Sequence, residues 1–191
     1  PLGAYASVES AMRGDRRSSK YTMSLDGEWK FHLAQSPLSA PDGFWKADFD
    51  DSAWAKISVP GNWQLAKNCT DKPIYTNIAY PFKPNPPFPP DANPTGCYRR
   101  SFKIPDSWDG REMFLVFESV DSAFHVWVNG QEVGYGEDSR LPAEFAVTPF
   151  VKKGLNTLAV RVLRYCSGTY LEDQDYWQMS GIQREVWLYA K

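Results

Sequence analysis

The sequence predicts an all-β domain built as a two-sheet β-sandwich of the jelly-roll type. Aromatic residues make up 15% of the 191 residues, and 15 prolines and 13 glycines accompany them. Aromatic side chains favour strands, whereas proline and glycine favour the turns between strands. About eight or nine segments show the alternating apolar pattern of strands, and none shows the periodicity of a long amphipathic helix.

The order of the strands can be followed from residue 25 onward. The segment Leu25–Leu33 alternates after its Asp26-Gly27 turn, and a short strand at Lys56–Val59 ends at Pro60-Gly61. An Asn-Gly pair at 129–130 separates two alternating runs and predicts a tight hairpin. The expected later strands are Cys97–Ile104, Glu112–Phe117, Ala123–Val128, Gln131–Tyr135, Glu144–Val147, Thr157–Leu163 and Arg184–Tyr189.

Two segments stand apart from this pattern. Residues 1–24 form a polar, basic leader that fits either a strap over the domain surface or a partly disordered terminus, so the folded domain is expected at 25–191. Residues 70–96 hold more than half of the prolines, which excludes a central strand or a helix. We expect an extended, ordered loop anchored by buried apolar side chains at Ile74, Tyr75, Ile78, Tyr80, Phe82 and Phe88.

Composition excludes several classes of partner. The formal net charge is −2, so a nucleic-acid partner is not expected. No apolar run approaches the ~20 residues of a membrane helix, so no membrane partner is expected either. The chain has neither an initiator methionine nor a signal peptide, and we therefore treat it as a fragment. Free thiols favour the cytoplasm, but a removed signal peptide would leave no trace, so the periplasm stays open too.

Most reactive side chains have no catalytic context. His32 and His125 both lie within strand patterns, away from a loop nucleophile. The cysteines Cys69, Cys97 and Cys166 are widely spaced, which predicts buried free thiols and no zinc site. The chain also lacks a glycine-rich nucleotide-binding motif, so no cofactor is expected in it.

One loop combines carboxylates with aromatic residues. Glu172, Asp173 and Asp175 lie beside Tyr170, Tyr176 and Trp177 between the last two predicted strands. Carboxylates accept hydrogen bonds from sugar hydroxyls and also bind hard cations, and rings stack on the apolar face of a sugar. A solvated acidic loop is the alternative. A retaining glycosidase needs two carboxyls held about 5–5.5 Å apart, which neighbouring loop residues rarely achieve.

Several runs of residues occur in a distinctive order along the chain. The runs are SLDGEWKF (24–31), VPGNWQ (59–64), PIYTNIAYP (73–81), NPPF (85–88), NPTGCY (93–98), SAFHVWVNG (122–130), VGYGEDSRLPAEF (133–145) and YLEDQDYWQMSGI (170–182). In this order they resemble the N-terminal jelly-roll domain of bacterial β-galactosidases of glycoside hydrolase family 2. The resemblance covers about residues 24–191, and the leader is similar to that of Bacteroidetes-type members.

The resemblance implies a galactose-binding-domain-like jelly roll in an enzyme that hydrolyses terminal β-D-galactosides with retention. The catalytic glutamates would belong to a TIM barrel C-terminal to Lys191, so no residue of this chain is expected to be catalytic and the fragment alone is expected to be inactive. Asn77 and Asp175 resemble substrate-binding residues, with Ile78 lining the same pocket. Asp175 would also bind sodium.

The resemblance implies sodium and magnesium in the full enzyme. Some relatives bind magnesium through a Gln where Glu137 stands and an Asp where Ser167 stands, and Ser167 is a poorer ligand, so that site is not expected here. The expected partners are a galactoside, the remaining domains of the parent chain and further copies of it in a homo-oligomer. Two alternatives stay open, namely a free-standing carbohydrate-binding module and a domain that serves mainly subunit assembly.

Overall fold

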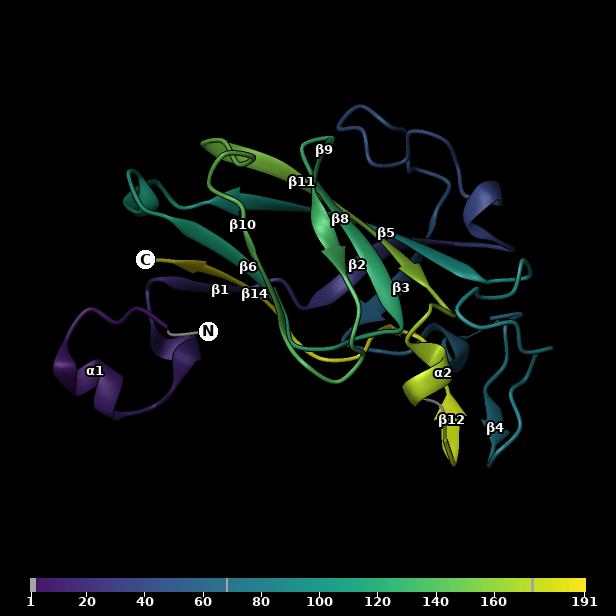
Figure 1. Ribbon diagram of the computed structural model, residues 1–191. Helices are drawn as coiled ribbons and strands as arrows, with labels where there is room; N and C mark the ends of the chain where they lie inside the picture. Colours follow the sequence, from purple (N-terminus) through teal and green to yellow (C-terminus); the bar gives the residue numbers. More distant parts are fainter. Residues whose placement is uncertain (1–2, 68, 173) are drawn as a thin grey trace.

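The computed structural model describes residues 3–67, 69–172 and 174–191, and strands in two facing sheets dominate this part of the chain (Figure 1). Every pairing between the described strands is antiparallel. One sheet contains, in spatial order, β1 (Thr22–Ser24), β14 (Val186–Ala190), β6 (Met113–Phe117) and β10 (Ala143–Ala146). The other contains β3 (Ala55–Val59), β2 (Gly27–Ala34), β5 (Thr95–Ile104), β11 (Gly154–Leu163), β8 (Ala123–Val128) and β9 (Gln131–Gly136).

Shorter elements complete the described structure. Two small ribbons pair β4 (Ile74–Thr76) with β12 (Tyr176–Gln178), and β7 (Val120–Asp121) with β13 (Gly181–Ile182). The helices are α1 (Val8–Met12) and α2 (Thr169–Glu172), and single 3₁₀ turns lie at Arg16–Ser18, Pro37–Ser39, Trp63–Leu65 and Asp106–Trp108. No helix in the described ranges has the length and apolar character that crossing a lipid bilayer requires.

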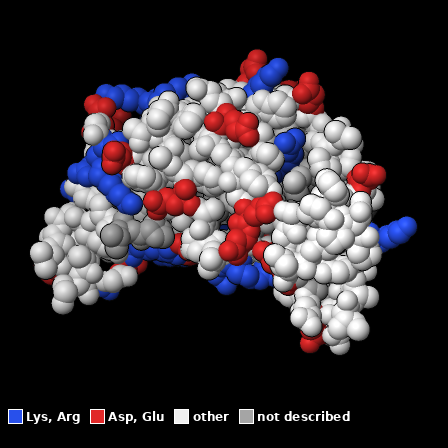
Figure 2. Space-filling view, viewed as in Figure 1, with Lys and Arg blue, Asp and Glu red and all other residues white. Residues whose placement is uncertain are grey.

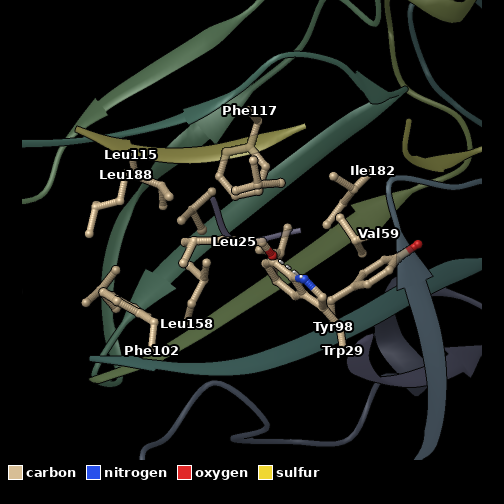
Figure 3. Packing of buried hydrophobic residues seen from close by; sticks show 14 of the residues in the cluster. Leu25, Trp29, Val59, Tyr98, Phe102, Leu115, Phe117, Leu158, Ile182 and Leu188 are labelled. Carbon is tan, nitrogen blue, oxygen red and sulfur yellow. Dashed lines mark hydrogen bonds between the residues drawn. The ribbon is translucent and has the colours of Figure 1, made fainter. Parts of the chain in front are cut away.

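The hydrophobic core fills the space between the two large sheets (Figure 3). Leu115, Phe117 and Leu188 of the four-stranded sheet face Trp29 and Leu158 of the six-stranded sheet, and each of the five is at most 1% exposed. Because alternate strand residues point to one face, this packing explains the period-two pattern of the sequence. Burying a large apolar side chain stabilises the fold by about 1.5–3 kcal/mol.

The leader, residues 3–21, packs on the outer face of the four-stranded sheet. The guanidinium carbon of Arg16 lies 4.6 Å from the centre of the Trp187 ring, and Arg16 forms ion pairs with Glu118 and Glu185. The Trp108 indole donates to the carbonyl of Lys20 at 2.8 Å. These contacts hold residues 16–20 of the leader against the sandwich, whereas α1 buries none of its residues. The strand β1 begins three residues before the predicted domain boundary.

The outer face of the six-stranded sheet is partly covered by the loop at residues 35–54. Phe44 of this loop is fully buried against Trp127 of β8. Arg99 of β5 holds this loop against the sheet. Its Nε donates to Asp51 at 2.7 Å, and its Nη1 donates to the carbonyls of Phe44 and Lys46.

Most of the predicted strands are confirmed, with shifts of one to three residues at their ends. Asn129 and Gly130 have φ values of 52° and 83°, the left-handed geometry of a tight hairpin turn between β8 and β9. The prediction for the proline-rich loop is wrong in part, because Tyr75, Ile78 and Phe88 are 52%, 83% and 64% exposed. An apolar side chain in a loop is expected to be covered, but its apolar character does not indicate whether the surface that covers it belongs to the same domain.

Candidate functional site

The small ribbon of β4 and β12 brings together two residues that the sequence singled out. Asn77 directly follows β4, and Asp175 directly precedes β12. The backbone N–H of Asp175 donates to the carbonyl of Asn77 at 2.6 Å. Asp175 has a φ of 53°, a left-handed conformation that aspartate tolerates better than most residues. We call β4, β12, Asn77 and Asp175 the site ribbon.

Two aromatic rings flank the Asp175 carboxylate. The Tyr75 hydroxyl donates to Asp175 Oδ1, and this hydrogen bond to an anion raises the pKa of Tyr75 above its usual 10.0. The Tyr75 and Trp177 ring centres are 5.6 Å apart, and the two side chains are 52% and 53% exposed. An exposed carboxylate beside open rings can accept hydrogen bonds from hydroxyls while apolar C–H groups lie on the rings.

An apolar surface surrounds the site ribbon. Ile78 follows Asn77 and is 83% exposed, and Leu171 of α2 is 90% exposed. Phe88 of the proline-rich loop adds to this surface. The corresponding lobe, at the lower right of Figure 2, carries few charged side chains. Large apolar side chains that are exposed in one region often mark a contact surface, so this lobe is suited to contact with another part of a larger protein.

The proline-rich loop is held against α2 by tyrosines. The Tyr80 hydroxyl donates to the carbonyl of Tyr170 at 2.8 Å, and the Tyr170 hydroxyl donates to the carbonyl of Phe88 at 2.8 Å. Phe82 packs on Tyr165 with ring centres 4.9 Å apart. Of the six predicted anchors, Tyr80 and Phe82 therefore do anchor the loop, although both stay partly exposed.

The predicted acidic cluster is not one cluster. Glu172 points away from Asp175, because its Oε2 accepts a hydrogen bond from Ser139 Oγ at 2.6 Å. Asp173 lies outside the described residues. Within the described ranges, no three Asp, Glu, His or Cys side chains gather as metal ligands. The Ser167 hydroxyl lies 3.3 Å from the Glu137 carboxylate, so these two positions are neighbours.

The two histidines lie on strands, and His32 is the register partner of the buried Cys97 across β2 and β5. His125 stacks on Trp127 and contacts Glu132 Oε1 through Nδ1 at 3.2 Å, and burial lowers the pKa of its imidazole. Burial raises the pKa of the Cys97 thiol to about 12, which keeps it protonated and unreactive. Cys69 is only half-buried, contrary to prediction, while Cys97 and Cys166 are buried as predicted.

Sequence reasoning missed a buried ion pair beneath the site ribbon. Arg164, the residue after β11, pairs with Asp71, which lies just before β4. The two residues are 93 positions apart, and neither belongs to a recognisable motif, so no local signal could have revealed their contact.

A jelly roll whose small ribbon carries a carboxylate beside exposed aromatic rings is suited to bind a hydroxyl-rich ligand. Comparison with known proteins identifies the family. Residues 22–191 match the sugar binding domain of glycosyl hydrolases family 2, and the chain belongs to this family.

Two relatives that match the whole chain agree with this assignment. The chain is 50% identical over 191 residues to a β-galactosidase of Psychromonas ingrahamii, and 48% identical over 194 residues to one of Vibrio cholerae. In both comparisons it is covered completely but spans only 18% of the relative's length.

Solved structures show the same fold. A calcium-binding mutant of Bacteroides uniformis β-glucuronidase 2 superposes with a TM-score of 0.67 and 26% identity, over 88% of this chain and 18% of that chain. A β-glycosidase from Bacteroides vulgatus gives a TM-score of 0.65 and 27% identity, over 88% and 20% of the two chains.

Proposed function

We propose that this chain is the N-terminal domain of a β-galactosidase and that it binds and orients the galactose unit for catalysis elsewhere in the parent chain. The relatives that match the whole chain are named β-galactosidases. The observation that carries the proposal is the junction of Asn77 and Asp175, which are 98 positions apart in sequence and joined by a 2.6 Å hydrogen bond.

The two residues have complementary chemistry for a sugar. The Asn77 amide both donates and accepts hydrogen bonds, while the Asp175 carboxylate accepts two or more. Together they would bind neighbouring hydroxyls and fix the orientation of the ring, with Ile78 as an apolar wall. Holding a substrate in its reactive orientation supplies a large part of enzymatic rate enhancement. The parent enzyme would then break the glycosidic bond by a retaining double displacement on two carboxyls outside this chain.

The residues fit only a shared sodium site. Asp175 offers an oxygen ligand, as hard cations require, but among the described residues it is not part of any group of three or more Asp, Glu, His or Cys side chains. The remaining ligands would come from the parent chain, and the cation would add positive charge next to a bound hydroxyl.

The test is hydrolysis of a chromogenic β-galactoside by the parent enzyme and by the 191-residue chain, with sodium and magnesium present. A matched β-glucuronide serves as control substrate. We expect the parent to prefer the galactoside and the fragment to be inactive. Turnover by the repurified fragment would refute the proposal, since the catalytic carboxyls would then lie within these residues.

Binding by the isolated chain tests the carbohydrate-binding-module alternative. Most of a pocket shared with another domain is absent from the fragment, so we expect galactoside binding weaker than millimolar. Millimolar or tighter binding in calorimetry would favour a free-standing module. A stable oligomer of sharp stoichiometry in light scattering would favour a role in subunit assembly.

A further inference from the structure

A buried ion pair between Arg164 and Asp71, held by further hydrogen bonds, lies at the base of the site ribbon. Arg164 is 4% exposed, and its Nη1 pairs with Asp71 Oδ1. The other carboxylate oxygen of Asp71 accepts hydrogen bonds from Trp63 Nε1 at 2.7 Å and from Gln64 Nε2 at 2.9 Å. The Asp71 carboxylate is thereby fixed from three directions.

The same guanidinium holds both halves of the ribbon. Arg164 Nη2 donates to the carbonyl of Lys72, just before β4, at 3.1 Å, and to the carbonyl of Gln178, the last residue of β12, at 3.2 Å. Gln64 adds a second link, because its Oε1 accepts from the backbone N–H of Ser180 at 2.9 Å. One side chain therefore joins the segment that leads into Asn77 to the segment that follows Asp175.

The ribbon itself is short. An isolated two-stranded ribbon is marginally stable, and β4 and β12 contribute only three residues each. Side-chain hydrogen bonds cross it from Gln178 Nε2 to Thr76 Oγ1 at 2.9 Å and from the Tyr75 hydroxyl to Asp175 Oδ1. The Arg140 guanidinium also lies 4.5 Å from the centre of the Tyr176 ring. Asp175 is three residues from Gln178, or about 10 Å along an extended strand. A small rotation at the base would therefore displace the tip.

We propose that Arg164 is a positioning residue that sets the orientation of the site ribbon, and through it the places of Asn77 and Asp175. A buried ion pair contributes little net stability compared with apolar packing, but its directional bonds select one geometry. The planar guanidinium is required, because a lysine cannot bond to the carboxylate and two carbonyls in the same plane. The expected effect of Arg164 on catalysis rests on the proposed function, whereas its expected effect on the geometry of the site ribbon does not.

Arg99 provides a matched control. It is also 4% exposed, pairs with Asp51 and donates to backbone carbonyls of a covering loop. That loop, at residues 35–54, packs on the outer face of the six-stranded sheet and not on the site ribbon. Arg99→Lys removes the same kind of interaction as Arg164→Lys at a place where no site residue depends on it.

The experiment compares Arg164→Lys and Arg99→Lys in the full-length enzyme, well below both melting temperatures. We measure kcat and KM for a nitrophenyl β-galactoside, and amide hydrogen exchange of peptides covering residues 72–78 and 174–180. For Arg164→Lys we expect kcat/KM to fall about 10-fold or more, since a displacement of about 1 Å can cost ~100-fold. We also expect faster exchange in both ribbon peptides, with Arg99→Lys unchanged in both measurements.

Each outcome is decisive. The proposal would be overturned if Arg164→Lys showed the same amide exchange in the ribbon peptides and the same kcat/KM as the wild type or as Arg99→Lys. If Arg164→Lys does not fold, Asp71→Asn keeps the side-chain shape but removes the charge that directs the Arg164 guanidinium. Faster exchange at 72–78 and 174–180 is again expected, and unchanged exchange overturns the proposal. A wild-type enzyme without β-galactosidase activity would refute the proposed function alone, since the exchange comparison still tests the ribbon.

Discussion

Replacing Asp175 by asparagine in the parent enzyme isolates the charge of the proposed sugar-binding carboxylate. Asparagine has nearly the same shape and tolerates the left-handed φ of 53°, and the backbone bond to Asn77 is kept. The carboxylate is exposed and, among the residues the structure describes, accepts a side-chain hydrogen bond from the Tyr75 hydroxyl. Stability should therefore change by less than about 1 kcal/mol. A hydrogen bond to a charged group contributes roughly 1.5–3 kcal/mol. If that contribution is made in the transition state, kcat/KM falls about 10- to 150-fold.

The assay is the initial rate of nitrophenyl β-galactoside hydrolysis over a range of substrate concentrations. Asp109→Asn is the control, because this exposed carboxylate pairs with Lys153 at the opposite end of β5 and β11. We expect the control to match the wild-type enzyme. An Asp175→Asn enzyme with kcat/KM within twofold of wild type would show that this carboxylate does not contact the substrate, and the reasoning from the ribbon would fail.

Three further predictions concern the fold. Gly96→Ala should lower the free energy of unfolding by about 1–3 kcal/mol in urea titrations, because a Cβ there would lie 2.9 Å from the Trp63 ring; an unchanged midpoint would contradict it. Burial opposes ionisation of Glu185, but hydrogen bonds from Arg16 and Trp187, together with the positive charges of Arg16 and Arg17, outweigh it and lower its pKa below 4.5. The contribution of Glu185 to stability should therefore persist above pH 4.5, disappear as the pH falls through the lowered pKa, and lose this pH dependence in Glu185→Gln. In thiol titration at pH 8, Cys97 should react only after denaturation, and native labelling would disprove its burial.

Local patterns accounted for the main strands, and long-range contacts account for what they missed. Strands such as β8 and β11 alternate because one face meets the core, so their positions could be predicted from residue order. The three-residue strands β4 and β12 carry too few residues for such a pattern, and they form only because distant segments meet. The strap role of the leader likewise depends on Arg16 reaching Glu118 and Glu185, more than 100 residues away.

In the candidate site, too, some features could be predicted from the sequence and others depend on long-range contacts. Asn77 and Asp175 were found through resemblance and through the unusual composition of their loops, and the structure places them side by side. Composition grouped Glu172 with Asp175, although the Ser139 hydroxyl holds Glu172 elsewhere. Tyr75 and Ile78 were predicted to be buried because they are apolar or aromatic, yet they lie on the surface of this chain. Sequence alone does not specify which molecule, or which part of it, covers an apolar side chain.

The placement of the C-terminal residue has a practical consequence for handling this domain. The backbone of Lys191 pairs with Glu112, beside the β5–β11 end that carries Ile104 and Gly154, whereas the site ribbon lies near Thr95 and Leu163 (Figure 1). Ten strand residues separate these ends, a span of about 33 Å. A dye, surface linker or affinity tag attached to the isolated domain after Lys191 would therefore leave the end that carries the site ribbon open, so sensor chips and single-molecule probes can be built without altering Asn77 or Asp175.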